Sequence, residues 1–257
     1  MKICILASGS SGNSIYIESH ETALIIDQGI SHKELKNRML SRGLDQKKIK
    51  GILVTHEHND HICGVGITSR ELGVPIYATS GSFEKMDKIL RGDEQLIIIE
   101  GGVPFKIGPM EIQPFSISHD ALDPVQFCIM SGRKKIAIAT DLGFVSTLVA
   151  QRIKDSDLIV IEANYDAEML RKGSYSWELK QRINGKKGHL SNSNAADIVF
   201  NITNNGIPKV VLAHISEENN RSDIAEKAVM ELFEKYDKKP GFLLAASQNE
   251  PTPVLEI

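Results

Sequence analysis

Three histidines and an aspartate lie within six consecutive residues of one segment: His56, His58, Asp60 and His61. Any protonated histidines among these groups would repel one another unless a cation lay between them. Imidazole and carboxylate together suit Zn²⁺, Mn²⁺ or Fe²⁺. The spacing differs from the HExxH of zinc proteases, because the fifth position after the start at His56 is Asp60 and not histidine.

Further candidate ligands stand at the ends of apolar runs that are predicted to be strands. Five such runs end at a residue that could bind a metal or support a ligand: Asp27, His56, His119, Asp141 and His214. In α/β sheets, binding sites form where loops leave the carboxyl ends of strands. One such residue alone is more often a hydrogen-bonded turn residue. All five together with the histidine segment favour a metal site.

The number of candidate ligands indicates two metal ions, because one tetrahedral ion takes only four ligands. The sequence offers seven: His56, His58, Asp60, His61, His119, Asp141 and His214. Two ions that share a bridging carboxylate and a bridging water would use them all. We therefore expect two divalent ions per chain, Zn²⁺ or Mn²⁺, with iron as a further possibility.

The elements that must position these residues are short Val, Ile and Leu runs typical of buried strands. They are predicted at 3–7, 14–18, 23–26, 51–55, 75–78, 111–118, 126–130, 135–140, 158–161, 209–213 and 242–246. Early hairpin-like strands followed by strand–helix alternation predict a layered α/β sandwich. Because no Pro/Gly/Ser-rich linker divides the chain, we expect residues 1–257 to form a single domain.

Helices are marked at their ends. Residues 31–34 form a capping box that opens a helix, and Gly43 closes it. A helical apolar stripe over 195–202 predicts a second helix that stops at Gly206, and a stripe over 225–233 predicts a third.

Composition excludes several classes of protein. The 257 residues carry a net charge of −3, with 41% hydrophobic and 25% charged residues. These values exclude a disordered tail, a collagen-like chain, a disulfide scaffold and a uniformly basic nucleic-acid coat. Three cysteines without a CxxC pair predict small buried thiols in a reducing compartment. The apolar run at 3–7 is too short for a signal peptide, and no run reaches the ~18 residues of a membrane span. We therefore expect a cytoplasmic protein with no membrane partner.

Two glycine-rich segments do not fit nucleotide-cofactor sites. Residues 64–69 have the spacing of GxGxxG, but they end in Ser69 and follow a polar loop instead of a strand. Residues 8–13 lack the GK[ST] of a Walker loop. A flexible hairpin turn is favoured there over a loop that meets a phosphate. No nucleotide cofactor is therefore expected.

A local basic stretch favours a polyanionic partner. Between Arg171 and Lys187 six basic residues accompany one acid, Glu178, which gives a local charge of +5. Cations that neutralise phosphates, with aromatics that stack on bases, are features of a nucleic-acid groove. The alternative is a solvated helix face that two aromatics anchor to the core. The candidate nucleic-acid-binding residues are Tyr175, Trp177, Lys180, Arg182, Lys186 and Lys187.

These motifs resemble the metallo-β-lactamase superfamily, whose mark is HxHxDH. Segments that run in order along the chain are similar to the YycJ/WalJ branch: 7–13, 55–61, 118–120, 139–141, 162–170, 188–192 and 212–220. The resemblance implies a four-layer αββα sandwich. It implies that His56, His58 and His119 hold one ion and that Asp60, His61 and His214 hold the other. Asp141 would bridge the two ions, and Asp27 would support the histidine segment.

The resemblance also implies nuclease activity, with 5′→3′ exonuclease action on DNA as the activity of the branch. We expect a metal-bridging hydroxide to attack phosphorus in line, with Asp60 and His189 as the candidate catalytic residues. His189 resembles the HST histidine of tRNA-processing relatives and is the candidate general acid, although a helix-entry residue is the alternative. His214 follows Asp141 by 73 positions, which leaves no room for a β-CASP insertion and favours DNA over RNA as the partner.

Other functions stay open at the level of sequence. The same site could hydrolyse a cyclic phosphodiester, a lactone or a thioester, because fold does not settle substrate. A non-catalytic, metal-stabilised nucleic-acid-binding module and an iron-dependent dioxygenase are further alternatives. Seven ligands plus His189 favour chemistry over a closed structural site. The oligomeric state is left open.

Overall fold

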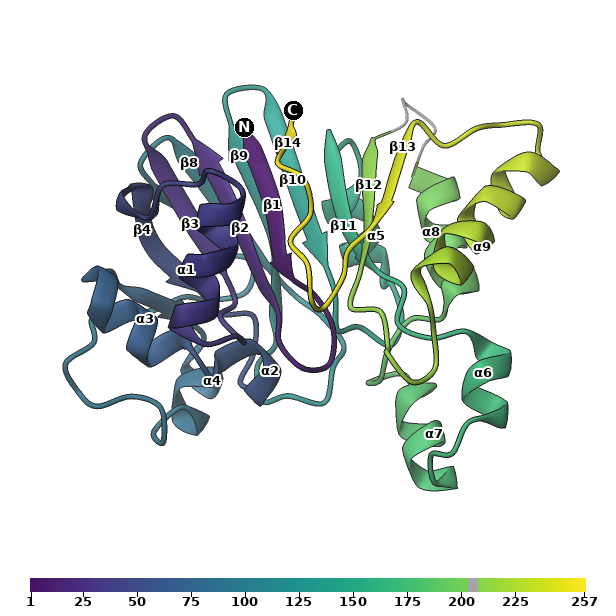
Figure 1. Cartoon of the computed structure of the whole chain (residues 1–257), viewed down its shortest axis with the longest axis horizontal. Coiled ribbons are helices and arrows are strands. Elements are labelled where there is room, and N and C mark those ends of the chain that lie inside the picture. Colours follow the sequence, from purple (N-terminus) through teal and green to yellow (C-terminus); the bar gives the residue numbers. More distant parts are fainter. Residues whose placement is uncertain (203–207) are drawn as a thin grey trace. The chain divides into compact units, whose positions relative to one another are not determined.

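Runs of Ile, Leu and Val form the strands whose ends carry the candidate site residues. The structure, a computed structural model, describes residues 1–202 and 208–257 (Figure 1). Gly206, the predicted helix stop, lies outside the described residues. The chain divides into two compact units, of which unit 1 comprises 1–116, 121–134 and 247–257 and unit 2 comprises 117–120 and 135–246. The single domain expected over 1–257 stays a prediction.

Unit 1 contains a seven-stranded sheet in the order β14-β1-β2-β3-β4-β5-β6. Its strands are β1 (Lys2–Ala7), β2 (Ser14–Ser19), β3 (Thr22–Ile26), β4 (Ile49–Leu53), β5 (Ile76–Ala78), β6 (Leu96–Ile98) and β14 (Leu255–Glu256). The strands from β14 to β3 pair antiparallel, and those from β3 to β6 pair parallel. Unit 1 also holds β7 (Phe105–Ile107), β8 (Met110–Ser116) and β9 (Val125–Ser131), which pair antiparallel in chain order.

The helices of unit 1 cover the sheet with their apolar sides. They are α1 (His32–Ser41), α2 (Asn59–Ile62), α3 (Val65–Leu72) and α4 (Ser80–Lys85), with the 3₁₀ turn η1 (Gln46–Lys48). Ser31 caps α1, because its hydroxyl accepts the Glu34 N–H at 3.2 Å. Gly43 follows the helix with φ +65°, so the predicted start and stop are confirmed. Leu35 and Met39 of α1 pack into the core with residues of the sheet.

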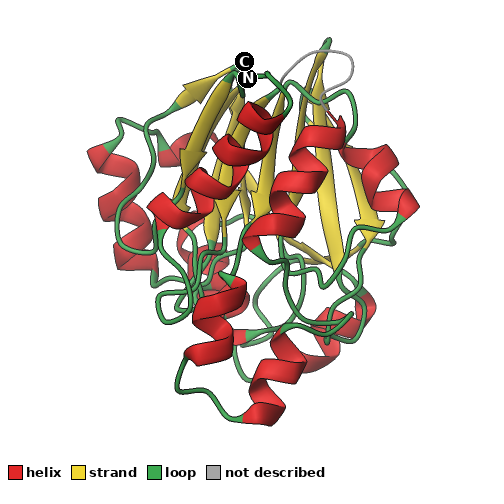
Figure 2. Cartoon of the chain, turned by 90° about the vertical axis from the view of Figure 1, so that its right-hand side faces the viewer, coloured by secondary structure: helices red, strands yellow, loops and turns green. Residues whose placement is uncertain are grey.

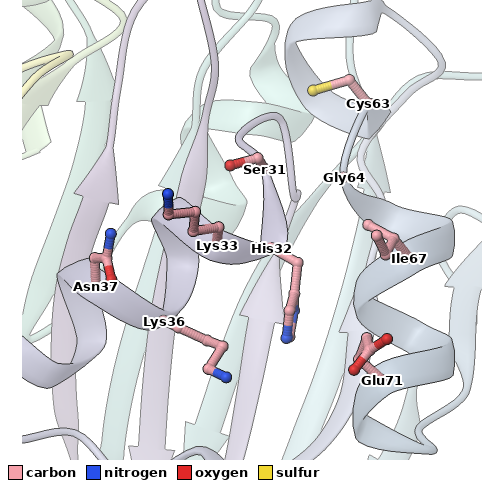
Figure 3. Close-up of a pocket in the computed structure, with 9 residues that line it drawn as sticks. All are labelled: Ser31, His32, Lys33, Lys36, Asn37, Cys63, Gly64, Ile67 and Glu71. Carbon is pink, nitrogen blue, oxygen red and sulfur yellow. The ribbon is translucent and has the colours of Figure 1, made fainter.

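A pocket of about 630 Å³ lies between α1 and α3 (Figure 3). His32 lies in this pocket, with its Nδ1 3.3 Å from the Thr68 hydroxyl. Burial lowers the pKa of His32. His32 therefore packs between α1 and α3 and is not among the candidate metal ligands.

Unit 2 is built on four parallel strands in the order β13-β12-β11-β10. They are β10 (Lys134–Ala139), β11 (Leu158–Glu162), β12 (Lys209–Ala213) and β13 (Phe242–Ala245), and the helices are α5 (Thr147–Ile153), α6 (Ala167–Lys172), α7 (Trp177–Ile183), α8 (Asn192–Ile202) and α9 (Ser222–Lys235). The predicted apolar stripes lie on α8 and α9. These helices pack side by side (Figure 2), with the rings of Phe200 and Phe233 5.3 Å apart.

Two sequence predictions need correction. Cys4 and Cys128 are buried as expected, but Cys63 is exposed because it lies in the turn after α2. The strand expected at 51–55 is β4, which ends at Leu53, because the Thr55 N–H leaves the sheet and donates to the Asp27 side chain. Among the described residues, no helix has the length and apolar character needed to cross a membrane.

Candidate metal centre

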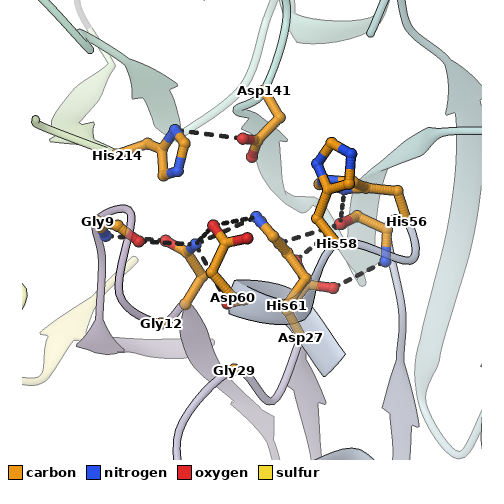
Figure 4. Close-up of polar contacts among 12 residues, drawn as sticks. Gly9, Gly12, Asp27, Gly29, His56, His58, Asp60, His61, Asp141 and His214 are labelled. Atoms are coloured by element: carbon orange, nitrogen blue, oxygen red, sulfur yellow. Dashed lines mark hydrogen bonds and ion pairs between the residues drawn. The ribbon is translucent and has the colours of Figure 1, made fainter. Parts of the chain in front are cut away.

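In unit 1, the segment that follows β4 carries the histidine cluster into the short helix α2. His56 and His61 are buried, and their ring centroids are 4.1 Å apart. His56 Nε2 and His58 Nδ1 lie 3.1 Å apart (Figure 4). Asp60 follows on α2, with its Oδ2 3.3 Å from His61 Nε2. The local HxHxDH spacing thus gathers four candidate ligands on one turn.

The buried carboxylate of Asp27, directly after β3, fixes the orientation of this cluster. Its Oδ1 accepts the Thr55 N–H at 2.8 Å, and its Oδ2 accepts the Thr55 O–H at 2.8 Å. Oδ2 also lies 2.7 Å from His61 Nδ1, which donates to it. Nε2 of His61 therefore carries the lone pair that a metal ion requires.

The same Thr55 hydroxyl also sets the tautomer of His56. Its hydrogen goes to Asp27, so its oxygen is the acceptor for His56 Nδ1 at 2.9 Å. Nε2 of His56 then carries the lone pair. Burial raises the pKa of Asp27, while the charge and hydrogen bond of His61 and the hydrogen bonds of Thr55 lower it.

Two residues of the preceding loops, Asn13 and Gly29, support the histidine cluster. The Asn13 N–H donates to the Asp60 carbonyl at 2.7 Å, and Asn13 Nδ2 donates to Asp60 Oδ2 at 3.2 Å. The Gly29 N–H in turn donates to the Asn13 carbonyl at 2.8 Å. A Cβ at Gly29 would lie 1.6 Å from the Asp60 carbonyl oxygen, so only glycine permits this close approach.

In unit 2, the candidate ligands Asp141 and His214 follow β10 and β12. Both residues have left-handed backbones, with φ of 56° and 53°, a conformation that is strained outside glycine and concentrates at functional sites. His214 Nδ1 lies 3.2 Å from Asp141 Oδ1 (Figure 4). The ring centroid of His189 lies 5.2 Å from that of His214 and 5.4 Å from that of His119.

Glu162, at the end of β11, is a site residue beyond those predicted from the sequence. Its side chain is fully buried, and Oε1 lies 2.8 Å from Nδ1 of both His189 and His214. Its Oε2 accepts the backbone N–H groups of Leu142 and Leu190. Burial opposes ionisation, but His189 and His214 hold the pKa of Glu162 well below its usual range. The sequence signal was present, because an acid ends an apolar strand there as Asp27 and Asp141 do.

The donor atoms of unit 2 fit a divalent ion. Asp141, Glu162, His189 and His214 each offer one ligand atom, and these atoms lie within 4.8 Å of one another. Because Glu162 Oε1 accepts from Nδ1 of both His189 and His214, Asp141 and His214 remain the candidate ligands of this group. Burial lowers the pKa of His119, which favours the neutral imidazole that metal binding requires. Imidazole nitrogens with carboxylate oxygens are the donors that Zn²⁺, Mn²⁺ and Fe²⁺ accept.

The basic side chains between Arg171 and Lys187 differ in their hydrogen-bond partners and exposure. Arg182 Nε donates to Asp120 at 2.6 Å, and Lys180 Nζ donates to the carbonyls of Arg171 and Gly173. Lys186 and Lys187 are exposed. The alternative in which aromatics anchor the stretch to the core is wrong for the tryptophan of α7, whose exposed fraction is 69%.

Comparison with known proteins identifies the class. A family model described as a β-lactamase superfamily domain matches residues 22–215. The chain therefore belongs to the metallo-β-lactamase superfamily, as its HxHxDH segment predicts. A solved metallo-β-lactamase fold protein, YhfI from Bacillus subtilis, is 16% identical with a TM-score of 0.74, and the match covers 98% of each chain. This likeness confirms the α/β fold class.

Among curated proteins, the chain is similar to two exodeoxyribonucleases. WalJ of Streptococcus pneumoniae is 37% identical over 263 residues, which cover 100% of this chain and 98% of the relative. YycJ of Bacillus anthracis is 35% identical over 234 residues, which cover 90% and 88%. With the family match, these relatives confirm that the chain is a metal-dependent hydrolase.

Replacing Asp27 with Asn should weaken the binding of divalent metal. Asp27→Asn removes the carboxylate that orients His61 and Thr55, and such a loss typically costs about 10- to 100-fold in metal affinity. Competition with a chromophoric zinc chelator measures the change. Asp45→Asn, which alters the exposed cap of η1, is the matched control. Equal zinc affinity in the two variants would contradict the role of Asp27.

Replacing Gly29 with Ala should displace the histidine cluster. The new Cβ would overlap the Asp60 carbonyl, so Gly29→Ala should lower both zinc affinity and thermal stability. Gly43→Ala is the control, because no atom lies within 4 Å of its Cβ. That variant should lose about 1–2 kcal/mol of stability from its left-handed backbone and keep its zinc affinity. Unchanged zinc binding in Gly29→Ala would contradict this account of the loop.

Proposed function

We propose that seven candidate ligands hold two divalent ions for hydrolysis, and that residues 1–257 act as a single domain. The ligands are His56, His58, Asp60, His61, His119, Asp141 and His214. Bound ions would stabilise developing charge on a phosphoryl group and lower the pKa of a bound water. The observation that carries the proposal is the pair of buried carboxylates, Asp27 and Glu162, that orient imidazoles within each unit.

We propose that this centre hydrolyses DNA as a cytoplasmic 5′→3′ exonuclease. The relatives named exodeoxyribonucleases cover nearly the whole chain, which supports a DNA substrate. Exposed Lys186 and Lys187 supply cations for phosphates. Exposed Trp177 supplies a surface on which a base can stack.

His189 is proposed as the general acid for the leaving 3′-oxygen. Its Nδ1 donates to the buried carboxylate of Glu162 at 2.8 Å, so the imidazolium form has a negative partner. The proton that it delivers then sits on Nε2. Its side chain is 20% exposed, which leaves it accessible to a substrate as a general acid must be.

The test of this function is degradation of end-labelled nucleic acid. Chelated protein reloaded with Zn²⁺ or Mn²⁺ is incubated with single- and double-stranded DNA and RNA. We expect DNA to be shortened, and a 5′ label to be released as mononucleotide before a 3′ label. Release of the 3′ label first would reverse the polarity, and no cleavage of the four substrates under either metal would overturn the nuclease proposal.

Replacing His189 with Ala should lower turnover by about 10²- to 10⁴-fold, the usual contribution of a general acid. The metal content of His189→Ala should stay at the wild-type value, because His189 is not among the proposed ligands. His20→Ala, at an exposed hairpin turn, is the control and should cleave normally. Loss of metal from His189→Ala would show that this histidine is a metal ligand and not the general acid.

Reversing the charges of Lys186 and Lys187 should weaken DNA binding and flatten its salt dependence. Each lost phosphate contact reduces the slope of log K against log salt by about 0.7 for single strands. The double variant Lys186→Glu/Lys187→Glu is compared with Lys47→Glu/Lys50→Glu, an exposed pair in unit 1 with the same charge change. A salt slope equal to that of the wild type would exclude these lysines from the DNA contact.

A further inference from the structure

A pocket of about 320 Å³ lies between α6 and α7, wholly within unit 2. Apolar and aromatic side chains line it together with two amides: Tyr165, Leu170, Trp177, Gln181 and Asn184. Its volume is near the lower end of the roughly 300–1,000 Å³ of small-molecule sites. This size suits one planar ring system and not an extended ligand.

Trp177 is the feature of this pocket that packing does not explain. It is the only tryptophan of the chain, and 69% of it is exposed at the first residue of α7. Tyr165 and Leu170, which line the same pocket, are only 3% and 5% exposed. A large apolar side chain exposed beside a buried apolar wall marks a place where a ligand can cover both.

Hydrogen bonds hold the two helices that form the pocket. Lys180 Nζ donates to the carbonyls of Arg171 and Gly173 at 2.9 and 2.7 Å, which ties α7 to the end of α6. The Tyr165 hydroxyl donates to Asn184 Oδ1 at 2.6 Å, which holds the other end of α7. The protein's own hydrogen bonds therefore hold the pocket, and binding does not require the helices to become ordered.

The polar groups of the pocket indicate the chemistry of its occupant. Because Asn184 Oδ1 accepts from Tyr165, the Nδ2 group of Asn184 is left to donate elsewhere. The Gln181 side chain, also in the lining, is exposed and can both donate and accept. The charged residues of the lining, Arg171 and Lys180, are both basic. An occupant should therefore be a flat ring that has hydrogen-bonding edges and is attached to an anion. The base and phosphate of a nucleotide fit this description.

We propose that this pocket binds one unpaired nucleobase of a single DNA strand, with Trp177 as the stacking surface and Arg171 near the adjoining phosphate. The inference rests on the proposed nuclease function and deepens it. Arg171 is available for this role because its ion pair with Glu168 is long, at 3.4 Å, and both side chains are more than 60% exposed. A base can enter only when it is out of the duplex, so the pocket favours single-stranded ends.

The pocket is connected to the proposed general acid through α7. The His189 N–H donates to the carbonyl of Ile183, in the last turn of α7, at 2.8 Å. The Gly188 N–H donates to the Gly185 carbonyl at 2.9 Å and completes the turn between them. A base held against α7 would thus fix the DNA strand relative to the protein backbone that carries His189. Trp177 and Asn184 are positioning residues in this account.

The experiment uses the intrinsic fluorescence of Trp177, because no other tryptophan contributes to it. The metal-loaded full chain is titrated with a phosphorothioate single strand of thymidines that resists hydrolysis. A strand of the same length and charge without bases is the matched probe, and free thymidine monophosphate is the third. We expect quenching by the strand with bases and none by the strand without them. Equal quenching by both strands, or equal affinity for the free nucleotide, would overturn the proposal.

Variants measured with a dye-labelled strand give an independent readout. Trp177→Ala should weaken binding by about 5- to 150-fold, the range of base–aromatic stacking, and Trp177→Phe should restore most of the affinity. Tyr236→Ala removes an aromatic that is 54% exposed at the end of α9 and should change nothing. Wild-type affinity in Trp177→Ala would refute the pocket even if labelled DNA is still degraded. Suppose that the strand with bases quenches the fluorescence and that Trp177→Ala binds it more weakly, but that no DNA is cleaved. That result would refute the nuclease function and support the pocket.

Discussion

The candidate ligands of each unit depend on one buried carboxylate, Asp27 in unit 1 and Glu162 in unit 2. A buried charge is costly unless hydrogen bonds and opposite charge compensate it. Asp27 receives an N–H, an O–H and an imidazole N–H, and Glu162 receives two imidazole and two backbone N–H groups. Each carboxylate therefore fixes how its histidines are oriented, and with that the ring nitrogen that remains for metal or substrate.

The ends of the strands hold several site residues in place. Asp27, Asp141 and His214 each occupy the first residue or two after a strand, and each has φ between 53° and 58°. A left-handed backbone at such residues costs about 1–3 kcal/mol and persists only where the surroundings determine it. The ends of β3, β10 and β12 provide those surroundings, so the chain leaves each strand with a side chain turned out of the ladder.

The sequence predicted most of what depends on local spacing. The histidines from 56 to 61 gather because a strand, a turn and a helix start lie within a few residues. The core strands were predicted because Ile, Leu and Val runs have few other places in a folded protein. The short strands β6, β7 and β14 were not, because two or three residues with partly exposed side chains carry little pattern.

What the sequence could not give depends on contacts between distant residues. The sequence presents Arg182 as one of six basic residues in a stretch with a single acid, yet its side chain pairs with Asp120, 62 residues away. Glu162 ends an apolar strand as Asp27 does, but its role depends on His189 and His214, which lie 27 and 52 residues further along the chain. The pocket of α6 and α7 likewise needs Tyr165 and Asn184 to meet. No pattern of residue spacing in the sequence shows which distant residues form such pairs.

The proposed centre uses seven ligands, more than one tetrahedral ion can take, so the number of ions per chain tests it most directly. Elemental analysis of protein loaded with excess zinc and then desalted should give two ions per chain. Removing one ligand from either unit, in His58→Ala or in His214→Ala, should reduce this number to about one. A single ion per wild-type chain that survives one of these substitutions would contradict a two-ion centre built from both ligand sets.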